Sequence, residues 1–379
     1  MAYQNTKWMK LYAVWQQRIA CGEWLCGSKL PSLQELSTLF GISYLTSQKI
    51  IRRLADEGWV KIVHGRGIYA SRPGAETVPA ARLENVQLMM QVCGDFFSEI
   101  YLNFQRNLPR DYRIRTCVPR DFKNDPTAIF RHRLEELSET GCRALIVDGN
   151  HWFNFQALEA CRPLPFPCTI AIHDFGRKQH PEFNRVLCDF EEAGYRAAGR
   201  LLEAGYERLY FLTHDRLDES EYIRRGLNGD ISDLMLCGIR RACRAAGVTF
   251  PVCREIRHNY GIFGNGLLIR DLKEIMERSS DRLGFIAISD NRALPVYQAA
   301  ENTRREIGSD VGIIGCFNCS GCCSQLCPPL TTIRFDETRI GAELAELTVS
   351  KAIGERVMIS PELVERASVS REQAMVQSG

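Results

Sequence analysis

Residues 31–57 read PSLQELSTLFGISYLTSQKIIRRLADE and carry the signals of two short helices joined by a tight turn. Ser32 can cap the first helix, with Glu35 three residues later as its capping-box partner. Gly41 suits the left-handed position that ends this helix, and Ser43 can cap the next one. The stretch therefore predicts a helix-turn-helix.

The sequence on either side of this stretch completes a small domain. Residues 7–20 carry apolar side chains at a spacing that forms one face of a helix, namely Trp8, Leu11, Tyr12, Trp15 and Ile19. After Gly58, residues 60–63 and 68–70 are typical of two short strands around Gly65, Arg66 and Gly67. We expect a winged helix-turn-helix domain over residues 1–72.

The second helix of such a motif can enter the major groove of double-stranded DNA. Its side chains expected outside are Tyr44, Thr46, Ser47, Gln48, Lys49, Arg52 and Arg53. They combine hydrogen-bonding groups suited to base edges with cations suited to phosphates. Arg66 at the tip of the hairpin can reach the DNA backbone or the minor groove. Operator DNA is thus the predicted partner.

The charge distribution fits this interpretation. Residues 1–73 hold ten Lys or Arg and four Asp or Glu, whereas the whole chain has a net charge of only +2. A basic N-terminal end on a mildly acidic body is what phosphate binding at one end requires, although a solvated charged face gives the same count.

These seventy residues resemble the GntR-type winged helix. The matching residues, in the family's order, are Gly27, Leu30-Pro31-Ser32, Glu35-Leu36, Phe40-Gly41-Ile42-Ser43, Thr46, Leu54, Glu57-Gly58 and Gly65-Arg66-Gly67. The resemblance implies DNA binding at Ser32, Tyr44, Thr46 and Arg66. Gln34 and Tyr44 stand where the family usually has arginines, so a different operator is expected. Gln34 and Ser43 complete the predicted DNA-binding set.

Residues 73–84 fall in a stretch rich in Pro, Gly and Ala, which we interpret as a linker. After it, apolar strands alternate with helices. We expect strands at 86–92, 113–118, 144–147, 168–172, 208–212, 284–288 and 311–314, and helices at 98–108, 126–140, 155–161, 191–204, 234–246, 267–279 and 293–306. Unalternating apolar strands between helices predict an α/β fold with doubly wound parallel sheets in two lobes.

This second region, residues 85–372, resembles the ligand-binding domain of the LacI/GalR regulators, which is itself similar to periplasmic sugar-binding proteins. The matching stretches include residues 95–97, 141–147, 205–209, 312–315, 329–334 and 361–369. The resemblance implies a two-lobed domain that binds a small-molecule effector, such as a carbohydrate, between its lobes.

In open parallel sheets, ligands bind beyond the carboxyl ends of the strands. The side chains expected there are Asp95, Phe96, Phe97, Asp148, His173, Asp174, Tyr260, Ser289, Asp290 and Asn318. Aromatic rings can stack on a sugar, and carboxylates can accept its hydroxyl hydrogens. Each of them is equally compatible with a structural role, and Asp290 with capping the helix that follows it.

Two departures from the sugar-binding relatives leave the ligand class open. Leu234, Met235 and Leu236 occupy a stretch where those relatives carry an arginine, and Phe317 and Asn318 follow the strand after which they carry an aspartate.

A cluster of cysteines gives an alternative signal. Cys316, Cys319, Cys322, Cys323 and Cys327 lie in CFNCSGCCSQLCPP, which has two C-x-x-C spacings and misses a ferredoxin pattern by one residue. The cluster indicates either a metal- or redox-sensing loop or a loop of reduced thiols without function.

The remaining expectations concern mechanism and location. The chain has no Walker A, dinucleotide, nucleophile-elbow or zincin motif, so we expect no enzyme and no cofactor. It has no apolar run of about 20 residues and no signal-peptide pattern, which predicts a cytoplasmic protein without membrane contact. We expect a homodimer on a palindromic operator and allosteric control by the effector, with repression relieved by the effector as the expected direction.

Overall fold

The computed structural model divides into two compact units, residues 1–82 and 83–379, which are described separately. The description covers residues 7–20, 24, 26–63, 65–71, 73, 84–90, 94–116, 134, 135, 137, 142–149, 158, 162–174, 181–213, 231–248, 254–257 and 264–370. The predicted linker lies mostly outside these residues, and Glu84, its last residue, begins a strand.

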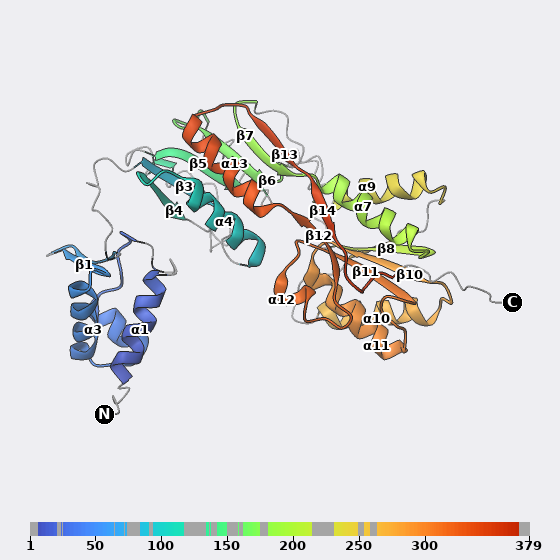
Figure 1. Ribbon diagram of the computed structural model, residues 1–379, viewed down its shortest axis with the longest axis horizontal. Coiled ribbons are helices and arrows are strands. Elements are labelled where there is room, and N and C mark those ends of the chain that lie inside the picture. The colour runs from blue at the N-terminus through green and yellow to red at the C-terminus, as the bar shows by residue number, and fades with distance from the viewer. Residues whose placement is uncertain are drawn as a thin grey trace. The chain divides into compact units, whose positions relative to one another are not determined.

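The described part of the first unit has three helices and a two-stranded antiparallel sheet, and α1, α3 and β1 are labelled in Figure 1. The elements are α1 (Lys7–Ala20), α2 (Leu33–Phe40), α3 (Tyr44–Asp56), β1 (Val60–Val63) and β2 (Gly67–Ala70). Their bounds match the predicted elements within a residue or two. Trp15, Ile19, Leu36, Ile50 and Leu54 have no exposed surface and form the core that all three helices share.

The described residues of the second unit form two six-stranded sheets. The first sheet has the order β13-β7-β6-β5-β3-β4, and the second has the order β14-β12-β11-β10-β8-β9. All neighbouring strands are parallel except β12 and β14. The strands are β3 (Glu84–Met89), β4 (Tyr112–Thr116), β5 (Cys142–Asp148), β6 (Cys168–Ile172), β7 (Asn184–Cys188), β8 (Arg208–Thr213), β9 (Arg254–Arg257), β10 (Leu283–Ala287), β11 (Val311–Cys316), β12 (Thr331–Phe335), β13 (Arg356–Ile359) and β14 (Pro361–Val364). We call the first sheet with its helices lobe 1, and the second lobe 2.

Helices cover these sheets. The described helices are α4 (Asp95–Asn107), α7 (Phe190–Glu203), α9 (Ile231–Ala245), α10 (Gly264–Glu277), the 3-10 turn η2 (Asp290–Ala293), α11 (Leu294–Thr303), α12 (Ser320–Cys323) and α13 (Glu337–Ser350). In lobe 1, α4 and α13 lie side by side (Figure 1). They approach so closely that a Cβ atom on Gly341 would lie 2.6 Å from the backbone nitrogen of Phe104.

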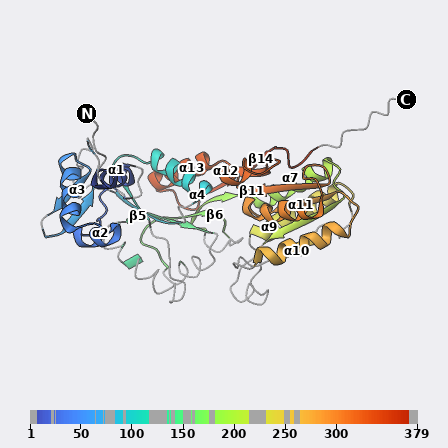
Figure 2. The same cartoon turned by 90° about the horizontal axis from the view of Figure 1, so that it is seen from below.

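The sheet of lobe 2 is buried on both faces. Along β8, Leu209 and Phe211 belong to the core that includes α7 and α9, whereas Tyr210 and Leu212 belong to the core that includes α10 and α11. Helices α10 and α11 lie next to each other in this layer (Figure 2). Burial on both faces explains why these strands are apolar throughout instead of alternating.

Among the described strands, the chain passes between the lobes three times, after β7, after β12 and between β13 and β14. The first two crossings end in the same way. Asp189 and Asp336 are the N-cap residues of α7 and α13, and their side chains accept hydrogen bonds from backbone nitrogens at 2.9 and 3.0 Å. The crossings therefore join the lobes through capped helix starts.

The structure differs from the sequence-based prediction in several elements. It contains elements that the sequence did not predict, namely strands β7, β9, β12, β13 and β14 and helix α13. The expected helix at 293–306 corresponds to α11, which follows the 3-10 turn η2 and ends at Thr303, with Arg304 as its C-cap in the left-handed conformation. The expected helices at 126–140 and 155–161 lie almost entirely outside the described residues. Within the described residues, no helix has the length and apolar character needed to cross a bilayer.

Candidate DNA-binding face and effector cleft

Both helices of the helix-turn-helix begin at capped ends. Ser32 and Glu35 form a complete capping box, in which Ser32 N donates to Glu35 Oε2 at 2.7 Å and Glu35 N donates to Ser32 Oγ at 3.3 Å. The backbone hydrogen bond from Ser32 lowers the pKa of Glu35. Ser43 Oγ accepts from the backbone nitrogen of Thr46, and Gly41 between the helices has φ 60°. These caps fix where the recognition helix α3 starts.

One predicted DNA contact lies on the wrong side of α3. Ser47 has no exposed surface and lies on the inner face with Ile50, Ile51 and Leu54. Its position follows from helix geometry, because residues three and four apart share a face. Ser47 is therefore a core residue, and the prediction that it reaches DNA is wrong.

Two predicted phosphate contacts lie against α1. The ammonium of Lys49 is 4.2 Å from the Trp8 ring centroid, and the guanidinium of Arg53 is 4.8 Å from the Tyr12 ring centroid. Arg53 Nε also lies 3.0 Å from Glu57 Oε1. Burial and the hydrogen bond to Glu57 raise the pKa of Tyr12 to about 12. These contacts hold α3 on α1.

Four further side chains of α3 reach its surface without a described contact to a ring of α1. Tyr44 and Leu45 are 51% and 73% exposed, Gln48 is half-buried and Arg52 is exposed. The hydroxyl of Thr46 lies 2.8 Å from that of Ser43, so these two residues serve the cap. Leu45 was missing from the predicted set, because an exposed leucine in a helical pattern cannot be told from a buried one without the structure.

The predicted contacts outside α3 gather around one groove. It has a volume of about 1040 Å³, and its lining includes Ser32, Gln34, Tyr44 and Arg66. Arg66 is exposed between Gly65 and Gly67, both of which have positive φ. Lys29, absent from the predicted set, adds a second cation to this lining. The groove thus unites the N-terminus of α2, the start of α3 and the wing.

The predicted effector residues lie at the carboxyl ends of strands in both lobes. Those of lobe 1 follow β3, β5 and β6, and those of lobe 2 follow β10 and β11. Tyr260 lies outside the described residues. Ile172, Phe317 and Asn318 adopt positive φ at these strand ends, a conformation that residues other than glycine rarely take. Such backbone is often found at ligand-binding sites.

Aromatic rings connect the two lobes at this place. Phe317 of lobe 2 lies 5.0 Å from Phe96 and 6.1 Å from Phe190, measured between ring centroids. His173 lies 6.3 Å from Phe190, and Phe97 lies 5.3 Å from Phe96. Phe96 and His173 are buried, whereas Phe97 is half-buried. Phe97 is therefore the predicted aromatic residue best placed to face a ligand.

Three polar side chains that were predicted to contact the effector form hydrogen bonds with other residues of the protein. Asp174 Oδ2 accepts from Arg185 Nε at 3.1 Å, and Asn318 Oδ1 accepts from Arg366 Nη2 at 2.7 Å. Asp290 has no exposed surface, and its carboxylate accepts from Thr332 Oγ1 at 2.5 Å and from the Cys319 backbone nitrogen at 2.7 Å.

Burial raises the pKa of Asp290 to about 6. Because this carboxylate is buried and accepts hydrogen bonds from two groups of the protein, it shapes the loops around it, and its contact with a ligand stays a prediction. Asp290 is not the side-chain cap of the following helix α11, since Ala293 holds the N-cap position and α11 has no side-chain cap. Asp95 is exposed at the start of α4, Asp148 is buried at the end of β5, and Ser289 is half-buried.

The cysteine cluster combines buried and exposed thiols. Cys316 and Cys323 are buried, and Cys327 is exposed, while the side chain of Cys322 lies outside the described residues. Burial raises the pKa of the Cys316 thiol and raises that of Cys323 to about 12, which opposes thiolate formation. Within the described part of the chain, no three His, Cys, Asp or Glu side chains are placed to hold a metal ion. The metal-sensing alternative has no support.

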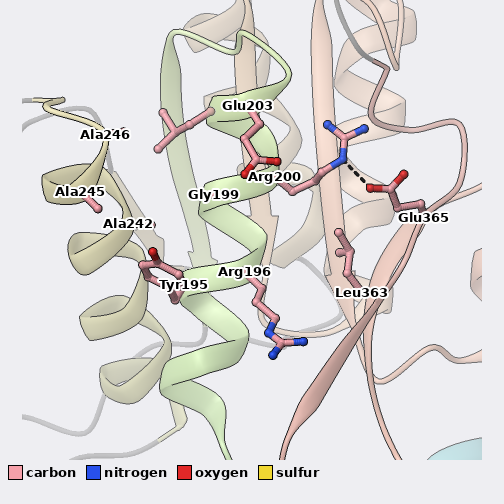
Figure 3. A pocket seen from close by; sticks show the side chains of 11 residues that line it. Tyr195, Arg196, Gly199, Arg200, Glu203, Ala242, Ala245, Ala246, Leu363 and Glu365 are labelled. Carbon is pink, nitrogen blue, oxygen red and sulfur yellow. Dashed lines mark hydrogen bonds and ion pairs between the residues drawn. The ribbon is translucent and has the colours of Figure 1, made fainter.

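A separate groove of about 590 Å³ lies between α7, α9 and β14, and none of the predicted effector residues lines it (Figure 3). Arg200 Nε reaches Glu365 Oε1 at 2.7 Å across its edge (Figure 3). Small residues, such as Gly199, Ala242 and Ala245, form part of its wall. It is distinct from the predicted cleft.

Two known family models match the chain, one in each of its two units. Residues 10–70 match the model of the bacterial regulatory proteins of the gntR family, and residues 198–369 match the periplasmic binding protein-like domain.

Similar whole proteins are regulators. The chain is 26% identical over 180 residues to the HTH-type transcriptional regulator CelR of Thermobifida fusca, a match that spans 46% of this chain and 48% of that protein. The chain thus spans about half the length of this relative. It is 21% identical over 369 residues to the arabinose metabolism transcriptional repressor of Geobacillus stearothermophilus, covering 92% of this chain and 94% of that protein.

The fold of the second unit is also known. A LacI family transcriptional regulator from Enterococcus faecium, solved with bound ribose, superposes with a TM-score of 0.59 at 17% identity and covers 76% of this chain and 99% of its own. This confirms the predicted two-lobed fold. The chain therefore combines a gntR-family DNA-binding domain with a periplasmic binding protein-like domain of the LacI-regulator fold.

Proposed function

We propose that this chain is a transcription regulator that binds operator DNA as a homodimer and is controlled by a sugar or sugar derivative bound between its lobes. The observation that carries the proposal is the groove of the first unit, which joins Tyr44 of the recognition helix to Arg66 of the wing. The proposal contains no catalytic step and no cofactor, and it places the protein in the cytoplasm with its DNA.

The chemistry of the groove suits a duplex. The start of α2 carries the partial positive charge of the helix dipole, which favours a phosphate. Arg52 on α3 and Arg66 on the wing are exposed cations on different elements. Cations on a helix and on a wing can hold the DNA backbone on either side of a major groove that α3 enters.

A dimer follows from the small size of one such interface. A single recognition helix contacts only a few base pairs. Two DNA-binding domains related by a twofold axis double the length of the site and make it palindromic. The large second unit supplies ample surface for the dimer contact.

The sugar assignment rests on the side chains at these strand ends and on the relatives. Half-buried Phe97 lies beside Phe96, which contacts Phe317, and an aromatic face can stack on the C–H groups of a sugar. Two relatives are named for arabinose metabolism or were solved with ribose. Asp95 and Ser289 add polar groups at the strand ends.

Control of DNA binding is expected to act through the lobes. Three crossings connect them, and two begin helices at Asp189 and Asp336. A ligand that contacts both lobes favours their closed arrangement by its differential affinity. Closure would change the positions in which the two DNA-binding domains of the dimer meet the operator, and we propose that this change releases the DNA.

The DNA part is tested by selecting duplexes from a random pool with the full chain. We expect enrichment of one palindromic sequence, and Arg66→Ala should reduce binding to it. Failure to enrich any duplex would contradict the proposal.

The effector part is tested by a thermal-shift screen of sugars and sugar acids. A true effector should raise Tm, and Phe97→Ala should weaken that response. Glu203→Gln, in the groove between α7 and α9, is the matched control and should leave the response unchanged. A response that is lost in the control and kept in Phe97→Ala would refute the cleft assignment.

A further inference from the structure

The recognition helix presents an apolar side chain at its most prominent outer position. Leu45 is 73% exposed, the largest exposed fraction among the large apolar side chains that the structure describes. It is the second residue of α3, directly after Tyr44. Apolar side chains with this exposure contribute almost nothing to the core, so the fold of the first unit does not account for it.

Helix formation does not account for Leu45 either. Several polar residues, including Lys, Gln and Glu, form helices about as well as Leu. The inner face of α3 is already complete with Ile50, Ile51 and Leu54, and its side toward α1 is occupied by Lys49 and Arg53. Leu45 therefore belongs to the outer face, which its helix presents to a partner.

The major groove of DNA offers one apolar group, the C5 methyl of thymine. Residues at the N-terminal end of a recognition helix are those that contact base edges. An exposed leucine at this end can cover a methyl group, whereas it cannot satisfy the hydrogen-bonding groups of guanine or cytosine edges.

We propose that Leu45 is a specificity-determining residue that contacts a thymine methyl group in each half of the operator. This rests on the proposed function. Gln48 lies three residues later on the same side of α3, and a glutamine amide pairs well with adenine. Leu45 and Gln48 together thus select A·T pairs, where Gln48 contacts adenine and Leu45 covers a thymine methyl.

The test removes the methyl group alone. A duplex enriched by the full wild-type chain is resynthesised with each thymine replaced in turn by deoxyuridine, and Kd is measured by fluorescence anisotropy. We expect one thymine in each half-site where this replacement weakens wild-type binding roughly fourfold, the effect of one buried methyl group. With Leu45→Ala, the same replacement should have no effect.

Two further variants make the result specific. Leu45→Met keeps an apolar side chain and should keep the penalty for deoxyuridine. Val14→Ala, which shortens a 40% exposed side chain on α1, should behave as wild type. If no thymine shows a penalty that disappears in Leu45→Ala, the inference is wrong although DNA binding stands. If the wild-type chain enriches no duplex, the proposed function itself fails.

Discussion

The ammonium nitrogen of Lys49 lies 4.2 Å from the centroid of the Trp8 ring, so this lysine of the recognition helix is directed at α1. Arg53, one turn later, lies over Trp8 and Tyr12. Two of the cations on α3 thus lie over rings of α1 although they are exposed, whereas Arg52 is an exposed cation of α3 for which no such contact with α1 is found among the described residues. The distinction has measurable consequences.

Replacing Arg52 by alanine should weaken DNA binding and reduce the slope of log K against log salt by about 1, because one phosphate contact releases about one counterion. Replacing Lys49 should change that slope less. It should instead lower the free energy of unfolding of the first unit by about 0.5–1 kcal/mol, the usual range for an exposed cation–π contact.

The salt series should be run by anisotropy on one selected duplex, and unfolding by urea. Arg278→Ala, which removes a 77% exposed arginine directly after α10, is the control and should change neither quantity. Equal loss of slope in the Lys49 and Arg52 variants would contradict the assigned orientation of α3.

Ser47 provides a second prediction. Its hydroxyl is buried and has no hydrogen-bond partner within the described residues. Because an unsatisfied buried hydroxyl is destabilising, Ser47→Ala should raise the free energy of unfolding by about 1 kcal/mol. DNA affinity should stay unchanged. Gln48→Ala should instead weaken DNA binding and leave the free energy of unfolding unchanged. A loss of DNA affinity in Ser47→Ala would restore Ser47 as a DNA contact.

Much of the first unit could be predicted because its signals are local. The capping box of Ser32 and Glu35 and the left-handed turn at Gly41 lie within a few residues of each other, and the structure contains both. The side on which each residue of α3 falls was harder to predict. Ser47 is small and polar and reads as a surface residue, although the register of Ile50 and Leu54 places it inside.

The second unit could be predicted less completely. Strands β12, β13 and β14 are short and pair with strands distant in the sequence, and β7 contains Asn184 and Arg185, which look like surface residues. Both are buried because they have specific partners. Asn184 donates to Ala352 O at 2.7 Å, and Arg185 pairs with Asp174. Such long-range pairing leaves no periodic pattern in the sequence.

The pair of Arg185 and Asp174 gives a third prediction. Both side chains are about nine-tenths buried. Arg185→Met removes the charged partner of a buried carboxylate and should lower the free energy of unfolding by about 3 kcal/mol. A combined Arg185→Met and Asp174→Leu variant should recover much of the loss in urea unfolding. If Arg185→Met alone costs nothing, Asp174 is free to serve a ligand.

Asp290 predicts a pH dependence of stability. Its pKa is raised from 3.8 to about 6 by burial, so the folded state binds its proton more tightly than the unfolded state does. The unfavourable contribution of the charged form is complete above pH 6 and fades as pH falls from about 6 to 3.8. Between pH 7 and pH 5, wild type should gain about 1 kcal/mol relative to Asp290→Asn.

Urea unfolding of both proteins at pH 7, 6 and 5 measures this difference. Other carboxylates cancel in the comparison, which isolates Asp290. A difference between the two proteins that does not change with pH would show that the buried carboxylate titrates at its ordinary value.

The central claim, that a ligand in the cleft controls DNA binding, is tested most directly by one titration. The full chain is bound to its selected duplex and the affinity is measured with and without a sugar that raises Tm. The account predicts a change of at least about fivefold, the lower end of typical allosteric coupling, in the direction of release. A sugar that binds to the protein yet leaves the DNA affinity unchanged would contradict it.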